Sequence, residues 1–362
     1  MFFTPNVNWV EVPMYWDAIT AFLLTLFSPT LQTIWMDSYG WNLHHHPYIE
    51  YTYMDMVLKA SKPNGGGPFH RLKEVTIMPS TRLPVHLIIP YLQVPSVTKF
   101  KASELRLTRE PLKPALHTTD LTLTGCCLVG NELMSFLLCF RSLRRLTYHH
   151  AAPRLSMLVA SHLKRGLANL KATLEELILI QEPGDNDRWS GDENSSNSDE
   201  SGMTSGGGGG GSEPFKHYVL GSLQPFEKLK TLHIESTFLL PIDSQRRPPE
   251  TPYIYTDEDC LALAESFPPS LQHLTLNISP SMYSDLSEVL SKGMVMSHTP
   301  SLRTFHLSFR HSFTLKMKRL KTLVGQLEKL RETLGEKGIG VTWNCMCGPP
   351  TPFRCYDDMR KL

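Results

Sequence analysis

A short apolar phrase of the form Leu-x-x-Leu-x-Leu recurs along the chain. Two apolar residues spaced two apart, with polar residues beside them, predict a β-strand that has one buried face. The apolar residue three positions earlier marks the turn into that strand. The phrase begins at Leu72, Leu143, Leu174, Leu229, Leu271 and Leu302, with Val, Ile, Tyr or Phe replacing leucine at some positions. Related strand patterns begin near Leu31, Val97 and Thr118.

The strand phrases are spaced as repeats. Successive starts lie 41, 25, 21, 25, 31, 55, 42 and 31 residues apart, and the shorter spacings match the roughly 20–29-residue period of leucine-rich repeats. Such recurrence predicts stacked units, each of which buries its apolar face on the next. We therefore expect one parallel sheet, in sequence order, from the strands at 75–77, 121–123, 146–148, 177–179, 232–234, 274–276 and 305–307.

Helical patterns precede many of the strand phrases. Apolar spacing of three and four residues predicts helices at 16–27, 131–140, 155–172 and 256–267. The same spacing predicts a terminal helix, 313–334, capped by Gly335 and followed by a last strand at 339–343. The predicted fold class is α/β: an irregular leucine-rich-repeat solenoid, or horseshoe, with a parallel sheet on its concave face and helices outside.

Polar sequence of low complexity interrupts the repeats. Residues 181–214 contain eight acidic residues, one arginine and a run of six glycines. This composition cannot bury enough apolar surface to offset the entropy lost on ordering, so it predicts a disordered insertion. The insertion separates an N-terminal half of the repeats, residues 1–180, from a C-terminal half, 215–344, which a tail follows at 345–362. Residues 241–256 form a second, shorter insertion.

The acidic insertion masks a basic excess in the rest of the chain. The whole chain has a formal net charge of +1 and the insertion carries −7, so the remaining residues carry about +8. An acidic protein partner complements this excess, which is too small and too dispersed to predict nucleic-acid binding.

Several features predict a location in the cytoplasm or nucleus, with no membrane partner. No apolar stretch reaches the roughly 20 residues that span a bilayer, and the first residues lack the basic region of a signal peptide. The seven cysteines have no disulfide-framework spacing, which favours a reducing compartment.

Polar residues within the phrases supply the candidate site. Side chains alternate along a strand, so the residues beside the central leucine face away from the core, and in a horseshoe they line the concave face. We predict that a partner binds there through Arg144, Arg145, Glu175, Lys230, His233, His273, Arg303 and His306. The alternative is that these are solvated surface residues without a common ligand.

The sequence offers little catalytic or metal-binding chemistry. The adjacent residues His44, His45 and His46 do not converge easily on one ion, and the cysteines at 345, 347 and 355 lack the paired C-x-x-C spacing of zinc sites. No glycine run precedes the Gly-Lys-Ser/Thr start of a phosphate-binding helix, and no hydrolase or metalloprotease motif occurs. We predict a binding protein without catalytic residues, metal or cofactor. An enzyme whose site is not visible in the sequence is the less favoured alternative.

Several phrases resemble the leucine-rich-repeat region of fungal F-box-type proteins. Residues 269–276 and 300–307 both begin Pro-Ser-Leu and continue with the repeat phrase, and residues 118–126 are similar to the cysteine-containing repeat, with Cys126 at the strand exit. The resemblance covers about residues 16–344 apart from the insertions. It implies a leucine-rich-repeat fold, partner binding and, as an alternative function, a substrate receptor of an SCF-type (cullin) ubiquitin ligase.

One departure from that family concerns the F-box itself. The first repeat already occupies residues 16–36, which leaves no block of roughly 40–50 residues before it for this compact module. The sequence therefore predicts either a receptor truncated of its F-box or a chain that never docks to a cullin. Ubiquitin-ligase components are expected partners only if an upstream F-box exists, and a non-functional gene fragment is the remaining alternative.

Overall fold

The computed structural model of the 362-residue chain describes its repeats with gaps between them. The described residues are 12–37, 69–78, 83–106, 116–126, 128, 131–151, 160–181, 220–239, 257–278, 299–310 and 317–346. The insertion predicted at 181–214 lies outside them except for Gln181, as do the second insertion, the histidines at 44–46, Cys347 and Cys355.

Ten strands form a single parallel sheet that is not closed. In order across the sheet they are β1 (Thr33–Asp37), β2 (Glu74–Met78), β4 (Lys99–Ser103), β6 (Asp120–Cys126), β7 (Arg145–His150), β8 (Glu176–Gln181), β9 (Thr231–Glu235), β10 (His273–Ile278), β11 (Thr304–Arg310) and β12 (Gly340–Met346). The order in space is the order in sequence, so the predicted parallel sheet is confirmed. The chain divides into two compact units, one made of residues 1–151, 162–180 and 226–231 and the other of the rest.

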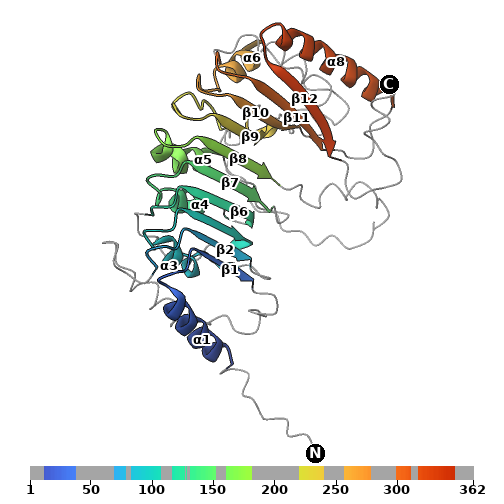
Figure 1. Cartoon of the computed structure of the whole chain (residues 1–362). Coiled ribbons are helices and arrows are strands. Elements are labelled where there is room, and N and C mark those ends of the chain that lie inside the picture. The colour runs from blue at the N-terminus through green and yellow to red at the C-terminus, as the bar shows by residue number, and fades with distance from the viewer. Residues whose placement is uncertain are drawn as a thin grey trace, which may run out of the picture. The chain divides into compact units, whose positions relative to one another are not determined.

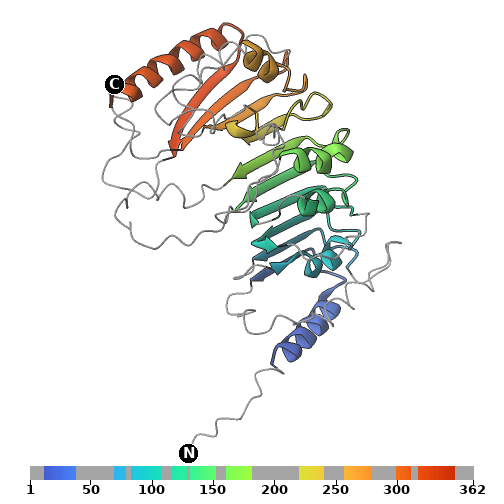
Figure 2. The ribbon, with the colours of Figure 1, turned by 180° about the vertical axis from the view of Figure 1, so that it is seen from behind.

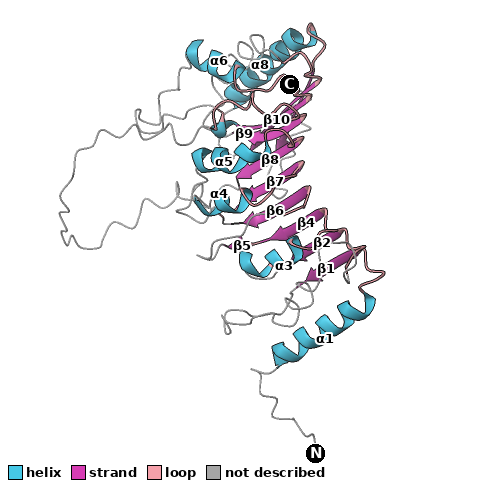
Figure 3. Cartoon of the chain, turned by 90° about the vertical axis from the view of Figure 1, so that its left-hand side faces the viewer, coloured by secondary structure: helices cyan, strands magenta, loops and turns pink. Residues whose placement is uncertain are grey.

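In the first unit, helices cover one face of the strands. The strands from β1 to β8 lie side by side (Figure 1), and α3 (Ile89–Leu92), α4 (Asn131–Leu137) and α5 (Ala160–Leu167) lie on the same side of them (Figure 3). α4 buries Leu133, Phe136 and Leu137. A Cβ atom on Gly166 of α5 would lie 3.1 Å from Met134 Cα and from Leu137 Cβ, so this glycine allows α5 to approach α4 closely.

Beneath these helices, two columns of apolar side chains cross the unit from strand to strand. The first column, in register, is Ile34, Val75, Phe100, Leu121 and Leu146. The second column is Met36, Ile77, Ala102, Leu123 and Tyr148. They are the apolar positions of the repeated phrase, and all but Met36 are at most 6% exposed. Because the side-chain period of a strand is two, this register keeps the apolar set of every strand on the same face.

A repeated backbone arrangement fixes that register at the entry to each strand. The carbonyl oxygen of Thr98 accepts hydrogen bonds from the N–H groups of Thr119 and Asp120, at 2.9 Å each. The carbonyl oxygen of Thr119 accepts in the same way from Arg144 and Arg145, at 2.7 and 3.0 Å. The pattern recurs at Lys73, Arg144, Glu175 and Gln272. The carbonyl oxygen of each turn thereby satisfies two backbone N–H donors of the next turn. As a result, polar residues at the same position of successive phrases form rows across the strands.

The second unit repeats this plan from β9 onward. It adds η5 (Ser236–Phe238), α6 (Asp257–Ala264) and α8 (Met317–Gly335), and α8 lies beside β12 (Figure 2). Its first apolar column is Leu274, Phe305 and Val341. α8 is amphipathic: it buries the leucines at 323, 327, 330 and 334, while Glu328, Lys329, Arg331 and Glu332 are exposed. Leu177 of the first unit and Leu274 of the second are at most 1% exposed, as predicted.

Element boundaries differ from the predicted ones in several places. The terminal helix is described from Met317, since residues 313–316 lie outside the described residues, and it includes Gly335. Gly338, at φ +76°, takes the left-handed conformation that was assigned to Gly335. β12 continues to Met346, two residues beyond the boundary predicted for the tail, because it pairs with β11 up to Arg310.

Other helices are shorter or longer than predicted. α1 (Val12–Phe27) begins four residues early, α4 ends at Leu137, and the helical pattern at 155–172 becomes α5 followed by a 3-10 turn, η2 (Ala168–Leu170). α3 was not predicted; neither was the 3-10 turn η1 (Val85–Leu87) nor the small parallel pair β3 (Leu83–Pro84) and β5 (Leu105–Arg106).

α1 is apolar on most of its described surface. Five of its large side chains, at 19, 22, 23, 26 and 27, are 45–66% exposed, and Ala21 is buried. Among the described residues, no helix combines the length and the hydropathy that crossing a membrane requires.

Candidate functional site: the open face of the sheet

The strand positions between the apolar columns form the face opposite the helices, which we call the open face. In the first unit its first row is Glu74, Lys99, Asp120 and Arg145. The second row is Trp35, Thr76, Lys101, Thr122 and Thr147. These side chains are exposed or half-buried, and none of the described helices of this unit lies over them (Figure 3). The open face therefore presents polar side chains in rows.

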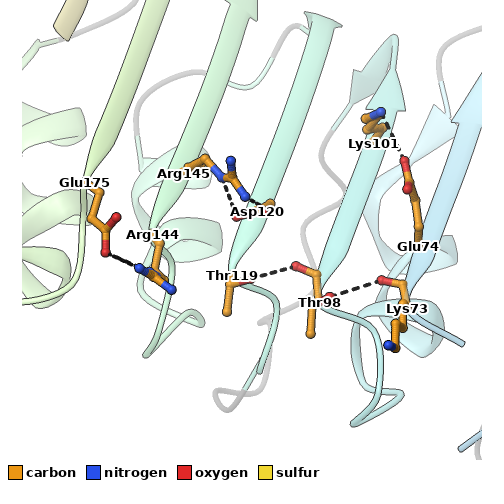
Figure 4. A network of polar contacts seen from close by, with 9 residues as sticks. All are labelled: Lys73, Glu74, Thr98, Lys101, Thr119, Asp120, Arg144, Arg145 and Glu175. Atoms are coloured by element: carbon orange, nitrogen blue, oxygen red, sulfur yellow. Dashed lines mark hydrogen bonds and ion pairs between the residues drawn. The ribbon is translucent and has the colours of Figure 1, made fainter. Parts of the chain in front are cut away.

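Ion pairs between neighbouring strands neutralise much of the charge on the first unit's open face. Lys101 Nζ lies 3.0 Å from Glu74 Oε1, and Arg145 Nη2 lies 2.8 Å from Asp120 Oδ2 (Figure 4). The sign of the charge alternates along the first row, from Glu74 through Lys99 and Asp120 to Arg145. Opposite charges on adjacent strands stabilise the sheet pairing.

The pair between Arg145 and Asp120 has the fork geometry of a bidentate ion pair. Arg145 Nε donates to Asp120 Oδ1 at 2.9 Å, and Nη2 donates to Oδ2 at 2.8 Å. The hydrogen bond and the charge of Asp120 raise the pKa of the Arg145 guanidinium, and Glu176 and Glu175 add to the effect. The side chain of Asp120 is 18% exposed and that of Arg145 is 56% exposed, so solvent screens the pair only in part.

The second predicted arginine is also paired. Arg144 donates from Nε and Nη2 to Glu175 Oε1, at 2.8 and 2.5 Å (Figure 4). Both residues are members of the predicted site, and they bind each other. Lys73, Lys99 and Lys230 are exposed and make no ion pair with any other described residue. Lys99 lies on the open face, whereas Lys73 and Lys230 directly precede β2 and β9.

In the second unit, the open face carries histidine–threonine pairs in place of ion pairs. His273 Nδ1 lies 2.8 Å from Thr304 Oγ1, and His306 Nδ1 lies 2.8 Å from Thr342 Oγ1. In both cases the threonine is the register partner on the next strand. Each imidazole is thus held by one nitrogen.

A third row in the second unit is polar but largely buried. Asn277 Nδ2 donates to Glu235 Oε1 at 3.0 Å, and Asn277 Oδ1 lies 3.0 Å from His233 Nε2. Asn277, Glu235 and Ser308 are at most 5% exposed. His233, at the same phrase position as His306, is therefore tied into this buried network and is less available to a partner.

The predicted site residues separate into two groups. Arg144, Arg145, Glu175 and Lys230 belong to the first unit, and His233, His273, Arg303 and His306 belong to the second. Within each group the residues lie on or just before successive strands. The residues that pair with them, Asp120, Asn277, Thr304 and Thr342, were not among the predicted site residues.

The described residues contain no cluster of three or more histidine, cysteine or carboxylate side chains able to hold a metal ion. Cys126 and Cys139 are buried, and their thiols donate to the backbone carbonyl oxygens of Thr124 and Ser135. Burial raises the pKa of Cys139. A thiol in that state is a poor nucleophile.

Comparison with protein-family models finds no match for this sequence, and comparison with curated proteins finds none either.

Proposed function

We propose that this chain is an irregular leucine-rich-repeat solenoid that binds a protein partner on the open face of its sheet. The observation that carries the proposal is the contrast between the two faces of the strands. One face is apolar and buried beneath helices, whereas the other presents rows of exposed polar side chains at fixed strand spacing. A long row of side chains on rigid strands is suited to an extended protein surface.

The leucine-rich-repeat assignment rests on the recurring phrase together with the recurring turn. The same paired acceptance of two N–H groups appears at seven strand entries, because the carbonyl oxygen of Gln32 also accepts from Lys73 and Glu74. In a horseshoe built from such repeats, the open face is the concave face.

The proposed partner surface is acidic. Lys73, Lys99 and Lys230 are first-unit cations that form no ion pair with another described residue, and complementary charge steers association. The acidic segment 181–214 of this chain is a competitor for the same cations, so its deletion is expected to strengthen partner binding most at low salt. We expect no nucleic-acid or membrane partner, and a location in the cytoplasm or nucleus.

The ubiquitin-ligase receptor function is a narrower version of this proposal. It requires an F-box in addition to the binding face, and an in-frame F-box encoded upstream of Met1 would support it. No described feature favours an enzyme over a binding protein.

Affinity capture with matched charge variants tests the proposal. The variant Lys73→Glu/Lys99→Glu reverses one cation on the open face and one directly before β2, neither of which forms an ion pair with another described residue. Its control, Lys164→Glu/Arg165→Glu, reverses two exposed cations on helix α5. We expect the open-face variant to lose the partner that the wild type and the control recover. Loss only in the helix variant would place the interface on the other face.

A further inference from the structure

We propose that His273, Arg303 and His306 form an oxyanion-binding surface in the second unit, which receives a carboxylate or phosphate group of the partner. The inference rests on the proposed function, because it names the partner chemistry that one part of the open face selects. It narrows the predicted set of partner-binding residues, which also included Arg144 and Arg145, to these three.

The first argument is preorganisation. Both imidazoles use Nδ1 for a 2.8 Å hydrogen bond to the threonine of the next strand. This contact orients each ring and leaves Nε2 as the nitrogen that faces a ligand. Neither ring bonds any other described residue. Side chains held in place before binding lose less conformational freedom when a ligand arrives.

The second argument is proximity. Thr275 is the register partner of His306, so His273 and His306 are diagonal neighbours on adjacent strands. Diagonal neighbours on one face of a sheet are close enough for long side chains to reach a common group, so one carboxylate or phosphate can contact both imidazoles. Arg303 directly precedes Thr304, and its N–H binds the carbonyl oxygen of Gln272, which precedes His273. His273 lies on β10 and His306 on the adjacent strand β11, and Arg303 lies in the turn directly before β11.

The third argument is electrostatic. The first two rows of this surface are His273, Thr304 and Gly340, and then Thr275, His306 and Thr342. Neither row contains a carboxylate, and Arg303 makes no ion pair with a described residue. Glu235, an acidic residue on β9 of this unit, lies in the buried third row and accepts a hydrogen bond from Asn277. In the first unit, by contrast, Arg144 and Arg145 already bind the carboxylates of Glu175 and Asp120.

Fluorescence anisotropy with the full chain and three labelled peptides tests the proposal. The probes are hexaglutamate, a peptide of equal length with one phosphoserine, and neutral hexaglutamine. We expect the wild type to bind one or both anionic probes and not to bind the neutral probe. In His273→Gln/His306→Gln the affinity should fall about tenfold or more at pH 6. The control His70→Gln/His117→Gln, which removes two exposed imidazoles from the first unit, should bind within about twofold of the wild type.

The two anionic probes distinguish a carboxylate from a phosphate as the natural group. The proposal is overturned if neither anionic probe binds, if hexaglutamine binds equally well, or if the His273→Gln/His306→Gln variant binds as the wild type does. If affinity capture places the partner on the open face but this variant still recovers it fully, the oxyanion surface is wrong and the proposed function stands.

Discussion

A double-mutant cycle on Asp120 and Arg145 measures how much their ion pair stabilises the folded chain. The result tells whether Arg145 is available to a partner. The two side chains make two hydrogen bonds, of 2.9 and 2.8 Å, and 18% of the aspartate and 56% of the arginine is exposed. Exposed pairs contribute roughly 0.2–1 kcal/mol. Bidentate geometry and a mostly buried carboxylate place this pair at the upper end, so we expect a coupling of about 1 kcal/mol.

The cycle compares Asp120→Asn, Arg145→Gln and the double variant by urea unfolding followed by circular dichroism. Arg145→Gln should be the more harmful single change, because it leaves the less exposed partner charged and unpaired. The control cycle pairs Asp120→Asn with Lys164→Gln, a cation on helix α5 that Asp120 does not bind, and its effects should add within about 0.5 kcal/mol. A coupling near zero would refute the reasoning, since Arg145 would then be free to bind a partner.

Three further predictions concern the core, a buried thiol and the insertion. Leu274→Ala removes a side chain that is 1% exposed and should lower the free energy of unfolding by about 2–5 kcal/mol; an unchanged urea midpoint would show that the strand faces are assigned wrongly. Burial raises the pKa of Cys139, so above about pH 8.5, the ordinary pKa of a thiol, the unfolded chain ionises this thiol more readily than the folded chain does. Stability should therefore fall as pH rises beyond that value, less so in Cys139→Ala, and mass spectrometry should find Cys139 alkylated only after unfolding. Limited proteolysis should cleave within 185–212 while the flanking halves stay associated, and protected amides across that span in hydrogen exchange would contradict this expectation.

The parallel sheet was predictable because its signal is local and repeated. Each phrase carries its own apolar pair, and stacking equivalent phrases requires parallel order. Leu177 and Leu274 are buried for that reason. Helix ends were less predictable: Gly335 looked like a cap, but the chain turns three residues later, at Gly338, where Ile339 N–H reaches back to the carbonyl oxygen of Leu334 at 3.0 Å.

The contacts among the site residues needed information that no single phrase contains. Glu74, Asp120 and Arg145 occupy the same phrase position, directly before the central apolar residue, so an alignment of the phrases would have indicated the alternation of charge. The phrase that contains Arg145 does not contain its ion-pair partner, Asp120, which lies in the preceding phrase. The contact between His306 and Thr342 depends on the register of two strands whose sequences differ, and the phrase pattern does not specify which residue of the next strand lies opposite.

Site-specific photo-crosslinking tests the central claim, that the open face binds the partner, most directly. A photoreactive phenylalanine analogue replaces Thr147 on the open face of the first unit or Thr342 on that of the second, and it replaces Lys164 on α5 or Glu332 on α8 as controls, all at exposed or half-buried positions. The account predicts adducts with a protein partner from Thr147, Thr342 or both, and none from the helix positions. Adducts from Lys164 or Glu332 alone would contradict it.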